Sequence, residues 1–369
     1  MGQTIDRRIW LKQTALTIGG LSIVPHLTAR EYDFKKPTGI IRLHANENPY
    51  GPSPLAKKAM VEAISSSNQY PWEVTTQLRE KIAAQFGLVK ENVLMGAGSS
   101  EILGIVAQYA AMKPGYAIAA DPTFGIWFTA AQRSGLEIIK VPVTTDKKHD
   151  LQQMKEKIND QTRLFYICNP NNPTGTVLPI ADLKDIITTV SKNTLILLDE
   201  AYTEYSDEPS LAAMVKDNPN LVIAKTFSKI YGMAGARIGY ALTHADTIKQ
   251  LNDLQPWANA GASAVSLAGA LASLGDQSFV KMSKTKNAEA RNLVAATFKE
   301  YAIPFIPSHT NFMYYSVKNQ KKDLLAALAN QHIRAGRLSD DNEKWSRISM
   351  GTIDEMKQFL QIVKQSFNS

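Results

Sequence analysis

The chain has 369 residues, of which 44% are hydrophobic and 20% are charged, so its composition is that of an ordinary globular protein. A chain of this length predicts about two domains and can bury a large core without disulfide bonds. Its single cysteine, Cys168, excludes an intramolecular disulfide framework and a cysteine-based structural zinc site. The net charge of +7 is spread along the chain, which slightly favours anionic small molecules and argues against a nucleic-acid partner.

The N-terminus has the layout of an export signal. Arg7 and Arg8 precede an apolar stretch at residues 15–24, and small residues follow up to Ala29. This order resembles the twin-arginine signal, with Asp6 where serine or threonine is usual. The apolar stretch is too short to cross a bilayer as a helix. We therefore expect a periplasmic protein. The alternative is an amphipathic N-terminal helix in a cytoplasmic protein, and cleavage of the segment is left open.

From about residue 32 onward, short apolar runs alternate with helical patterns. The apolar runs predict strands at residues 92–95, 116–120, 136–143, 163–168, 194–198 and 221–224. Helical periodicity predicts helices at residues 101–111, 180–191, 278–301 and 353–367. Because strands and helices alternate, we expect an α/β fold in which a mostly parallel sheet lies between helices.

The pattern changes after about residue 259, where longer helices and mixed elements replace the alternation. This change predicts a second, smaller domain of the α+β class. The expected organisation is a signal segment at residues 1–29, an N-terminal arm at 30–55, a large domain at 56–258 and a small domain at 259–369. No segment after the leader resembles a membrane span.

Ligands of an open α/β sheet bind beyond the carboxyl ends of its strands, so the residues that follow each strand are informative. After the first predicted strand comes Gly96-Ala97-Gly98-Ser99-Ser100. Glycines allow a tight turn, and the free N–H groups of the next helix attract a phosphate. The third glycine of a dinucleotide-binding fingerprint is missing, which argues against a nicotinamide oxidoreductase. A plain capped helix is the alternative interpretation.

Two further predicted strands end in polar residues. Residues 169–175 have the sequence Asn-Pro-Asn-Asn-Pro-Thr-Gly, which predicts a polar site or, alternatively, a simple turn. Asp199 follows the next strand. A buried carboxylate needs a cationic partner, because burying it unpaired is costly, and a protonated ring nitrogen is one such partner. The alternative role for Asp199 is the N-cap of a helix.

A lysine after the last predicted strand has neighbours that suit a nucleophile. Lys229 follows Thr226 and Ser228, and Arg237 comes later in the same segment. A lysine among other cations can have a lowered pKa and act as a nucleophile. A lone lysine is usually a solvated surface group, so this interpretation depends on the neighbouring residues.

These segments together resemble the pyridoxal-phosphate-dependent aminotransferases of fold type I. The resemblance rests on the turn at residues 169–175, on Asp-Glu-Ala-Tyr at 199–202 and on Ser-Lys at 228–229. Three more segments are similar to histidinol-phosphate aminotransferases: Leu-His-Ala-Asn-Glu-Asn-Pro-Tyr-Gly-Pro-Ser at 43–53, Tyr-Pro at 70–71 and Arg-Ile-Ser-Met-Gly-Thr at 347–352. The similarity runs in order along most of the chain. It implies a large domain with a mostly parallel sheet and a smaller α+β domain.

The resemblance implies pyridoxal 5'-phosphate as the cofactor and assigns residues to it. Lys229 would bind the cofactor covalently and move a proton, Asp199 would pair with the ring nitrogen, and Tyr202 would hydrogen-bond the phenolic oxygen. Phe124 would stack on the ring. The other implied cofactor-binding residues are Gly98, Ser99, Ser100, Asn172, Thr226, Ser228 and Arg237, with Tyr70 supplied by the neighbouring subunit of a homodimer.

Substrate recognition is implied mainly through arginines. Arg347 would bind a substrate carboxylate by a two-point contact, with Tyr50 and Asn172 also at the substrate. A substrate phosphate would be bound by Arg337, with Arg334 as the alternative. No metal ion is implied at the site.

The implied reaction moves an amino group from an amino compound, with L-histidinol phosphate as the leading candidate, to a 2-oxo acid such as 2-oxoglutarate. One alternative is a broad-specificity or aromatic amino acid aminotransferase, and a phosphothreonine decarboxylase is a more distant one. An alternative from a different class is a non-catalytic protein that binds pyridoxal phosphate or an amino acid. Ser100 stands where the family usually has aspartate, and this departure concerns the phosphate end of the site.

Overall fold

The computed structural model describes residues 39–336 and 344–367. The predicted export signal and Arg337 lie outside the described residues. The chain divides into the units Met1–Ile40 and Ile41–Ser369, and the fold described below is that of the second unit. Among the described residues, no helix has both the length and the apolar character needed to span a membrane.

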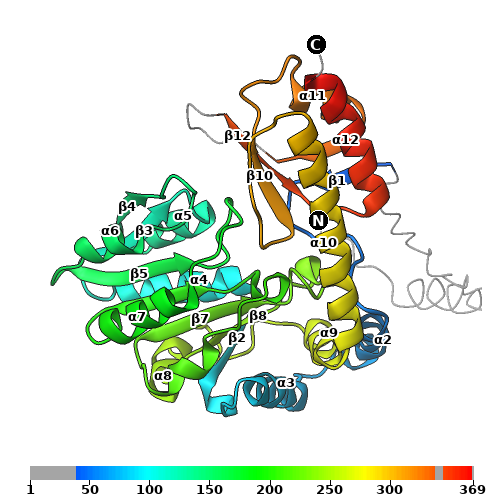
Figure 1. Cartoon of the computed structure of the whole chain (residues 1–369). Helices are drawn as coiled ribbons and strands as arrows, with labels where there is room; N and C mark the ends of the chain where they lie inside the picture. The colour runs from blue at the N-terminus through cyan, green and yellow to red at the C-terminus, as the bar shows by residue number, and fades with distance from the viewer. Residues whose placement is uncertain (1–38, 337–343, 368–369) are drawn as a thin grey trace, which may run out of the picture. The chain divides into compact units, whose positions relative to one another are not determined.

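A seven-stranded sheet forms the centre of the fold (Figure 1). Its strands, from one edge to the other, are β2 (Val93–Gly96), β8 (Gly239–Leu242), β7 (Leu221–Thr226), β6 (Leu195–Asp199), β5 (Thr162–Cys168), β3 (Tyr116–Asp121) and β4 (Glu137–Pro142). Neighbouring strands are parallel except for β8, which runs antiparallel to β2 and β7. The prediction of a mostly parallel sheet is confirmed, and the six predicted strands are all present. Strand β8 was not predicted, because its short Gly-Tyr-Ala-Leu sequence carries little strand signal.

Apolar side chains on both faces of the sheet hold it between helices. Side chains alternate along a strand, so Leu195 and Leu197 of β6 face one core while Ile196 and Leu198 face the other. The first core is covered by α4 (Ser99–Ala111), α5 (Gly125–Arg133) and α8 (Ala245–Asn252). The second is covered by α3 (Trp72–Gln85), α6 (Leu151–Glu156), α7 (Ile180–Val190) and α9 (Ala264–Gly275), and α2 (Pro54–Ala63) packs on α9. Burial on both faces explains the nearly continuous apolar runs of the sequence.

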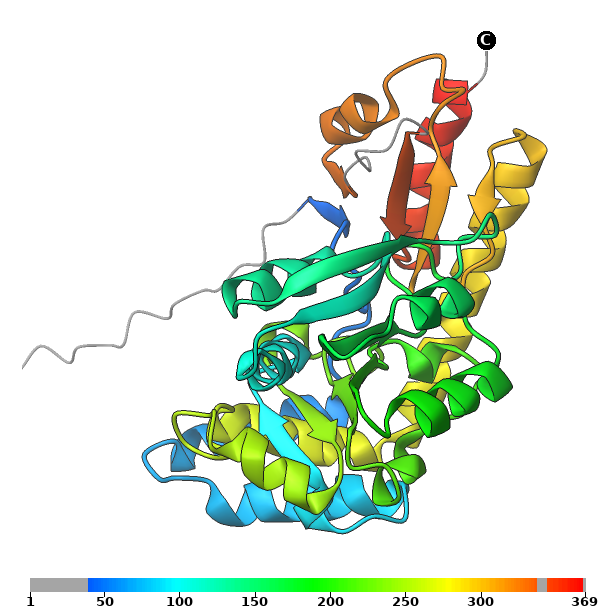
Figure 2. The ribbon, with the colours of Figure 1, turned by 90° about the vertical axis from the view of Figure 1, so that its left-hand side faces the viewer.

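A second, three-stranded sheet lies nearer the C-terminus (Figure 2). Strand β10 (Phe312–Ser316) lies between β9 (Phe305–Ile306) and β12 (Trp345–Ser349) and is antiparallel to both. Its core contains side chains of α10 (Gln277–Glu300), α11 (Leu324–Asn330) and α12 (Ile353–Phe367). The early strand β1 (Ile41–Leu43) pairs with β11 (Ile333–Ala335), which brings two segments that are distant in the sequence side by side.

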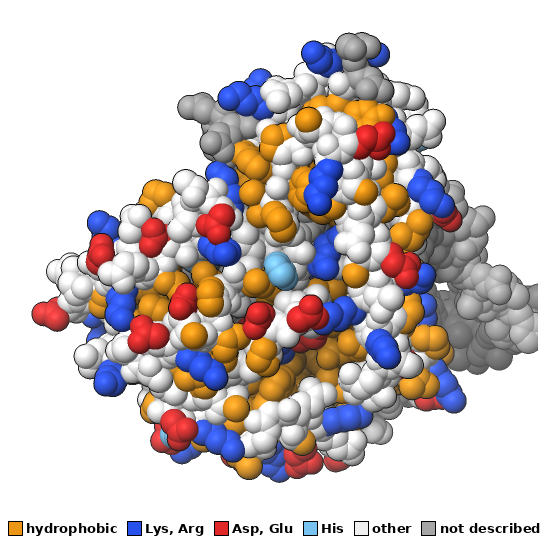
Figure 3. Space-filling view, viewed as in Figure 1, with side chains coloured by type: hydrophobic (Ala, Val, Ile, Leu, Met, Phe, Trp, Pro, Cys, Tyr) orange, Lys and Arg blue, Asp and Glu red, His pale blue; other side chains and the backbone are white. Residues whose placement is uncertain are grey.

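The domain limits proposed from the sequence stay a prediction. The packing adds one observation: α9 shares the second core of the large sheet, whereas the later residues of α10, such as Val294 and Phe298, belong to the core of the small sheet. On the face seen in Figure 3, basic and acidic side chains are interspersed over both regions.

A close contact joins β8 to the start of α4. A Cβ on Gly239 of β8 would lie 2.5 Å from the backbone nitrogen of Ser99 and 2.9 Å from the carbonyl oxygen of Lys225. These contacts are with backbone atoms, which cannot move aside as a flexible side chain can. Glycine therefore allows β8 to lie between β2 and β7 directly beneath the first residues of α4.

Candidate active site

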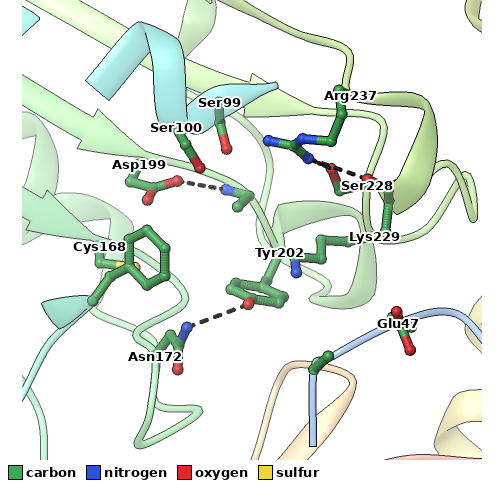
Figure 4. A pocket seen from close by; sticks show the side chains of 14 residues that line it. Glu47, Ser99, Ser100, Cys168, Asn172, Asp199, Tyr202, Ser228, Lys229 and Arg237 are labelled. Atoms are coloured by element: carbon green, nitrogen blue, oxygen red, sulfur yellow. Dashed lines mark hydrogen bonds between the residues drawn. The ribbon is translucent and has the colours of Figure 1, made fainter. Parts of the chain in front are cut away.

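The carboxyl ends of β5, β6 and β7 and the start of α4 surround one cavity of about 240 Å³ (Figure 4). The register places Cys168, Asp199 and Ala224 side by side on adjacent strands, so the turns that follow these strands start at the same edge. Nine of the predicted residues line the cavity: Ser99, Ser100, Phe124, Asn172, Asp199, Tyr202, Ser228, Lys229 and Arg237. Residues that the sequence analysis did not assign also line it: Ala45, Glu47, Cys168, Ala201 and Ala234.

Asp199 is the buried acid of this cavity. It is the last residue of β6 and is only 3% exposed. Its carboxylate accepts hydrogen bonds from the Tyr166 hydroxyl at 3.2 Å and from the Ala201 N–H at 3.1 Å. Burial raises the pKa of Asp199 to about 6, although both donors favour the charged form. The described part of the chain forms no ion pair with this carboxylate, so a cation supplied by a ligand suits the position.

The alternative role of Asp199 as a helix N-cap does not match the structure. The element that follows is the short 3-10 helix η3 (Thr203–Tyr205), and its N-cap residue is Tyr202. The side chain of Asp199 instead points toward the cavity (Figure 4).

Lys229 lies across the cavity from Asp199, in the turn after β7 (Figure 4). Its Nζ is 5.5 Å from the centre of the Tyr202 ring. Burial, assisted by the positive charge of Arg347, lowers the pKa of Lys229 to about 8 against the opposing charges of Asp199 and Glu47. More of the amine is therefore neutral near pH 7 than in an exposed lysine, which suits a nucleophile.

A hydrogen-bond network connects Tyr202 with the N-terminal segment and with Arg347. The Nδ2 atoms of Asn46 and Asn172 donate to the Tyr202 hydroxyl at 2.9 Å and 3.4 Å. Arg347 donates to Asn172 Oδ1 at 2.5 Å and to the carbonyl oxygen of His44 at 2.9 Å. The Nε of Arg347 is buried and has no hydrogen-bond partner among the described residues. Arg347 is thus fixed beside the cavity by two of its five N–H donors.

The start of α4 and Arg237 form an anion-binding end of the cavity. Gly98, at φ 89°, precedes the helix, and a Cβ at this position would clash with the guanidinium of Arg237. Arg237 also donates to Ser228 Oγ at 3.5 Å. Thr226 donates to Ser228 Oγ at 2.9 Å but lies behind it, outside the cavity lining. Free helix N–H groups, hydroxyls and a guanidinium together suit a phosphate.

Tyr70 does not reach this cavity within its own chain. It is 65% exposed and packs on Trp72 and Trp257, with ring centres 5.3 Å and 4.9 Å apart. These aromatic residues line a second hollow of the surface. The sequence prediction places Tyr70 in the cavity of a neighbouring subunit, and a single chain does not test it.

The residues predicted for the substrate are only partly brought together. Arg347 and Asn172 are hydrogen-bonded to each other beside the cavity. Tyr50 is half-buried but does not line the cavity, and Arg334 is exposed on β11. Arg337 lies outside the described residues.

Asn46 and Glu47 are the main polar site residues that the sequence analysis missed. The carboxylate of Glu47 accepts hydrogen bonds from Arg42 at 2.9 Å and 2.7 Å, and these bonds lower the pKa of Glu47. Both residues lie in segment 43–53, in which only Tyr50 was expected to have a role. The sequence signal that could have indicated them is the run of polar residues at 46–48. In the structure, Asn46 and Asn48 of this run are buried.

The residues present fit pyridoxal phosphate. A carboxylate that has no ion pair within residues 39–336 and 344–367 lies at one side of the cavity, an amine of lowered pKa lies opposite, and a helix start with an arginine suits the phosphate. Phe124 lies on the cavity wall, where an aromatic face can contact a ring.

Comparison with known proteins agrees with this chemistry. The family model for class I and II aminotransferases matches residues 38–363. The chain is 34% identical over 333 residues to the histidinol-phosphate aminotransferase of Brevibacillus brevis, covering 89% of this chain and 90% of the relative. It is 32% identical over 355 residues to that of Moorella thermoacetica, covering 94% and 91%.

Solved structures agree as well. The crystal structure of histidinol-phosphate aminotransferase from Sinorhizobium meliloti in complex with pyridoxal-5'-phosphate is similar with a TM-score of 0.79 and 26% identity, over 89% of this chain and 90% of that one. The family match over most of the chain, together with the site geometry, establishes that this chain belongs to the class I and II aminotransferases, enzymes of fold type I that use pyridoxal phosphate.

Proposed function

We propose that this aminotransferase transfers the amino group of L-histidinol phosphate to a 2-oxo acid such as 2-oxoglutarate. The observation that carries the proposal is the arrangement of Asp199 and Lys229 across one cavity, with Arg347 fixed at its side. Support for the substrate comes from relatives named histidinol-phosphate aminotransferases, which are 34% and 32% identical over most of the chain.

The residues of the site have distinct chemical tasks in this reaction. Pyridoxal phosphate, when bound, supplies a ring that accepts electrons from the substrate α-carbon. Asp199 holds a proton at the ring nitrogen, because its buried carboxylate requires a cation. Tyr202 and Asn172 orient the phenolic oxygen. Lys229 binds the cofactor and then moves a proton to or from the substrate carbon, a task that suits an amine with a pKa of about 8.

Arg347 binds the carboxylate of the amino acid or 2-oxo acid that takes part in the reaction. Asn172 and His44 hold its guanidinium in place, and the free Nε lies on the same planar group. A planar fork of donors matches a carboxylate in a way that lysine does not reproduce.

A broad-specificity or aromatic amino acid aminotransferase is the second candidate. The observation that favours it is the position of Arg334, which is exposed on β11 and does not line the cavity. A substrate without a phosphate needs no second arginine, so the role of Arg337 separates the two candidates.

We expect the rate at which the apoprotein binds pyridoxal phosphate to rise with pH around a midpoint near 8. The reason is that only the neutral amine of Lys229 attacks the aldehyde, and burial and Arg347 lower its pKa to about 8. Arg347→Gln removes a positive charge and moves the midpoint upward. The exposed Arg334→Gln is the control and leaves it unchanged. Stopped-flow absorbance measures the rates, and a midpoint near 10.5, the ordinary lysine value, would contradict the assignment.

Arg337→Ala should reduce kcat/KM for L-histidinol phosphate about tenfold or more while changing kcat/KM for L-phenylalanine little. The physical reason is the loss of a charged hydrogen bond, which contributes roughly 1.5–3 kcal/mol. Arg334→Ala is the matched comparison. Single-turnover kinetics with each amino donor measure the effect. An equal loss for both donors would remove the phosphate-binding role and favour the second candidate.

We also propose that the enzyme is a homodimer in which Tyr70 reaches the cavity of the partner. Support comes from the exposed cluster of Tyr70, Trp72 and Trp257, which are 65%, 42% and 50% exposed, since exposed apolar clusters often mark interfaces. Light scattering should give twice the chain mass, and Tyr70→Ala should weaken binding of pyridoxal phosphate. A monomer at micromolar concentration would contradict the proposal.

Export to the periplasm is a separate proposal, supported by Arg7, Arg8 and the apolar stretch at residues 15–24. A folded reporter fused after residue 40 should reach the periplasm, and replacement of both arginines by lysine should retain it in the cytoplasm. Cell fractionation measures the distribution. Equal export with and without the arginine pair would exclude the twin-arginine route.

A further inference from the structure

A buried ionic cluster lies beside the cavity but outside its lining. Lys225, which is 3% exposed, places Nζ 3.1 Å from Glu200 Oε2 and 2.9 Å from Glu204 Oε1. Glu200 also accepts hydrogen bonds from the Ser210 hydroxyl at 2.5 Å and from the Leu211 N–H at 3.0 Å. The cluster therefore has one ammonium between two carboxylates, and the buried oxygens of Glu200 are satisfied.

The members of the cluster come from the turn after β6 and from the end of β7. Glu200 directly follows Asp199, and Glu204 belongs to η3, which starts next to Tyr202. Lys225 lies on β7, in the segment that continues to Lys229. The ion pairs thus connect the turn after β6 with the end of β7, shortly before the turn that carries Lys229.

Few backbone hydrogen bonds connect the turn after β6 with the turn after β7. The last hydrogen bond between the two strands runs from the Glu200 N–H to the Ala224 carbonyl oxygen at 2.9 Å. In the described chain, no backbone hydrogen bond joins residues 201–206 to residues 226–233. The relative position of the two turns beyond the sheet therefore depends on side chains.

The electrostatic balance keeps Lys225 charged. Burial opposes the charged form of Lys225, but the carboxylates of Glu204 and Glu200 outweigh it and hold the pKa of Lys225 above its usual range. Lys225 is thus a permanent cation near the cavity, whereas Lys229 is a lysine of lowered pKa within it. A buried charge network of this kind holds its geometry, because every displaced member would leave an unpaired charge.

We propose that Lys225, Glu200 and Glu204 form an ionic clamp that positions Asp199 and Tyr202 opposite Lys229 for cofactor binding. The proposal rests on the function proposed above for these three cavity residues. The clamp residues do not line the cavity, so they act as positioning residues: Glu200 and Glu204 lie beside Asp199 and Tyr202 in the chain, and Lys225 holds both carboxylates from the end of β7.

Glu204→Gln is the substitution that disturbs the cluster least, because Lys225 keeps its ion pair with Glu200. We expect the dissociation constant of the apoprotein for pyridoxal phosphate to rise about tenfold, a size of effect known for residues behind the ligands of metal sites. The visible circular dichroism of the bound cofactor, which reports its orientation, should change as well. Thermal unfolding of the apoprotein is followed in parallel and should change little.

Three further variants complete the experiment. Lys225→Arg retains a cation that can contact both carboxylates and should restore near-parental binding and dichroism, whereas Lys225→Met should lose both. Lys155→Met removes an exposed ion pair with Asp185 and serves as the control, with no effect on the cofactor. If Lys225→Met does not fold, the Glu204→Gln and Lys225→Arg variants still decide the question.

The outcomes separate the clamp from the assignment of the site. Borohydride reduction of the loaded parent must fix the cofactor on Lys229, and if it does not, the site assignment itself is wrong. If it does, and Glu204→Gln binds pyridoxal phosphate with parental affinity and dichroism, the clamp is overturned while the site stands. A Glu204→Gln variant that lowers only the unfolding midpoint also overturns the clamp, because the cluster then serves stability alone.

Discussion

The buried carboxylate of Asp199 is the constraint on which the rest of the site depends. Strand β6 places it between β5 and β7, level with Cys168 and Ala224, where it is 3% exposed. Its hydrogen bonds come from a phenol and an amide, neither of which carries charge. A buried carboxylate of this kind is costly unless a cation approaches it, so the fold itself favours a ligand with a protonated nitrogen.

The pKa values of Asp199 and Lys229 reflect opposing influences across one cavity. Burial raises the pKa of Asp199 and lowers that of Lys229, so burial favours the neutral form of both groups. The charge of each group opposes this effect on the other, while Arg347 lowers the pKa of Lys229 further. The ionic clamp of Lys225, Glu200 and Glu204 is not isolated from this balance, because the charge of Glu200 adds to the raised pKa of Asp199.

Sequence reasoning located the strand ends well because their signals are local. Asp199, Asn172 and Lys229 each lie within a few residues of an apolar run, and parallel strands bring such ends to one edge. Asn46 could not be assigned in this way, since its bond to Tyr202 joins residues 156 positions apart. The pairing of β1 with β11 and the insertion of β8 between β2 and β7 are likewise long-range contacts that no local periodicity predicts. Thr226 is hydrogen-bonded to Ser228 and does not line the cavity, so its role at the cofactor phosphate stays a prediction.

The identity of the lysine that binds the cofactor is the most direct test of the site. The protein loaded with pyridoxal phosphate is reduced with borohydride, digested and mapped by mass spectrometry, with fragments that distinguish Lys225 from Lys229. We predict a cofactor label on Lys229 alone, since the ammonium of Lys225 is held by two carboxylates. A label on Lys225, on any other lysine or on none would contradict this prediction.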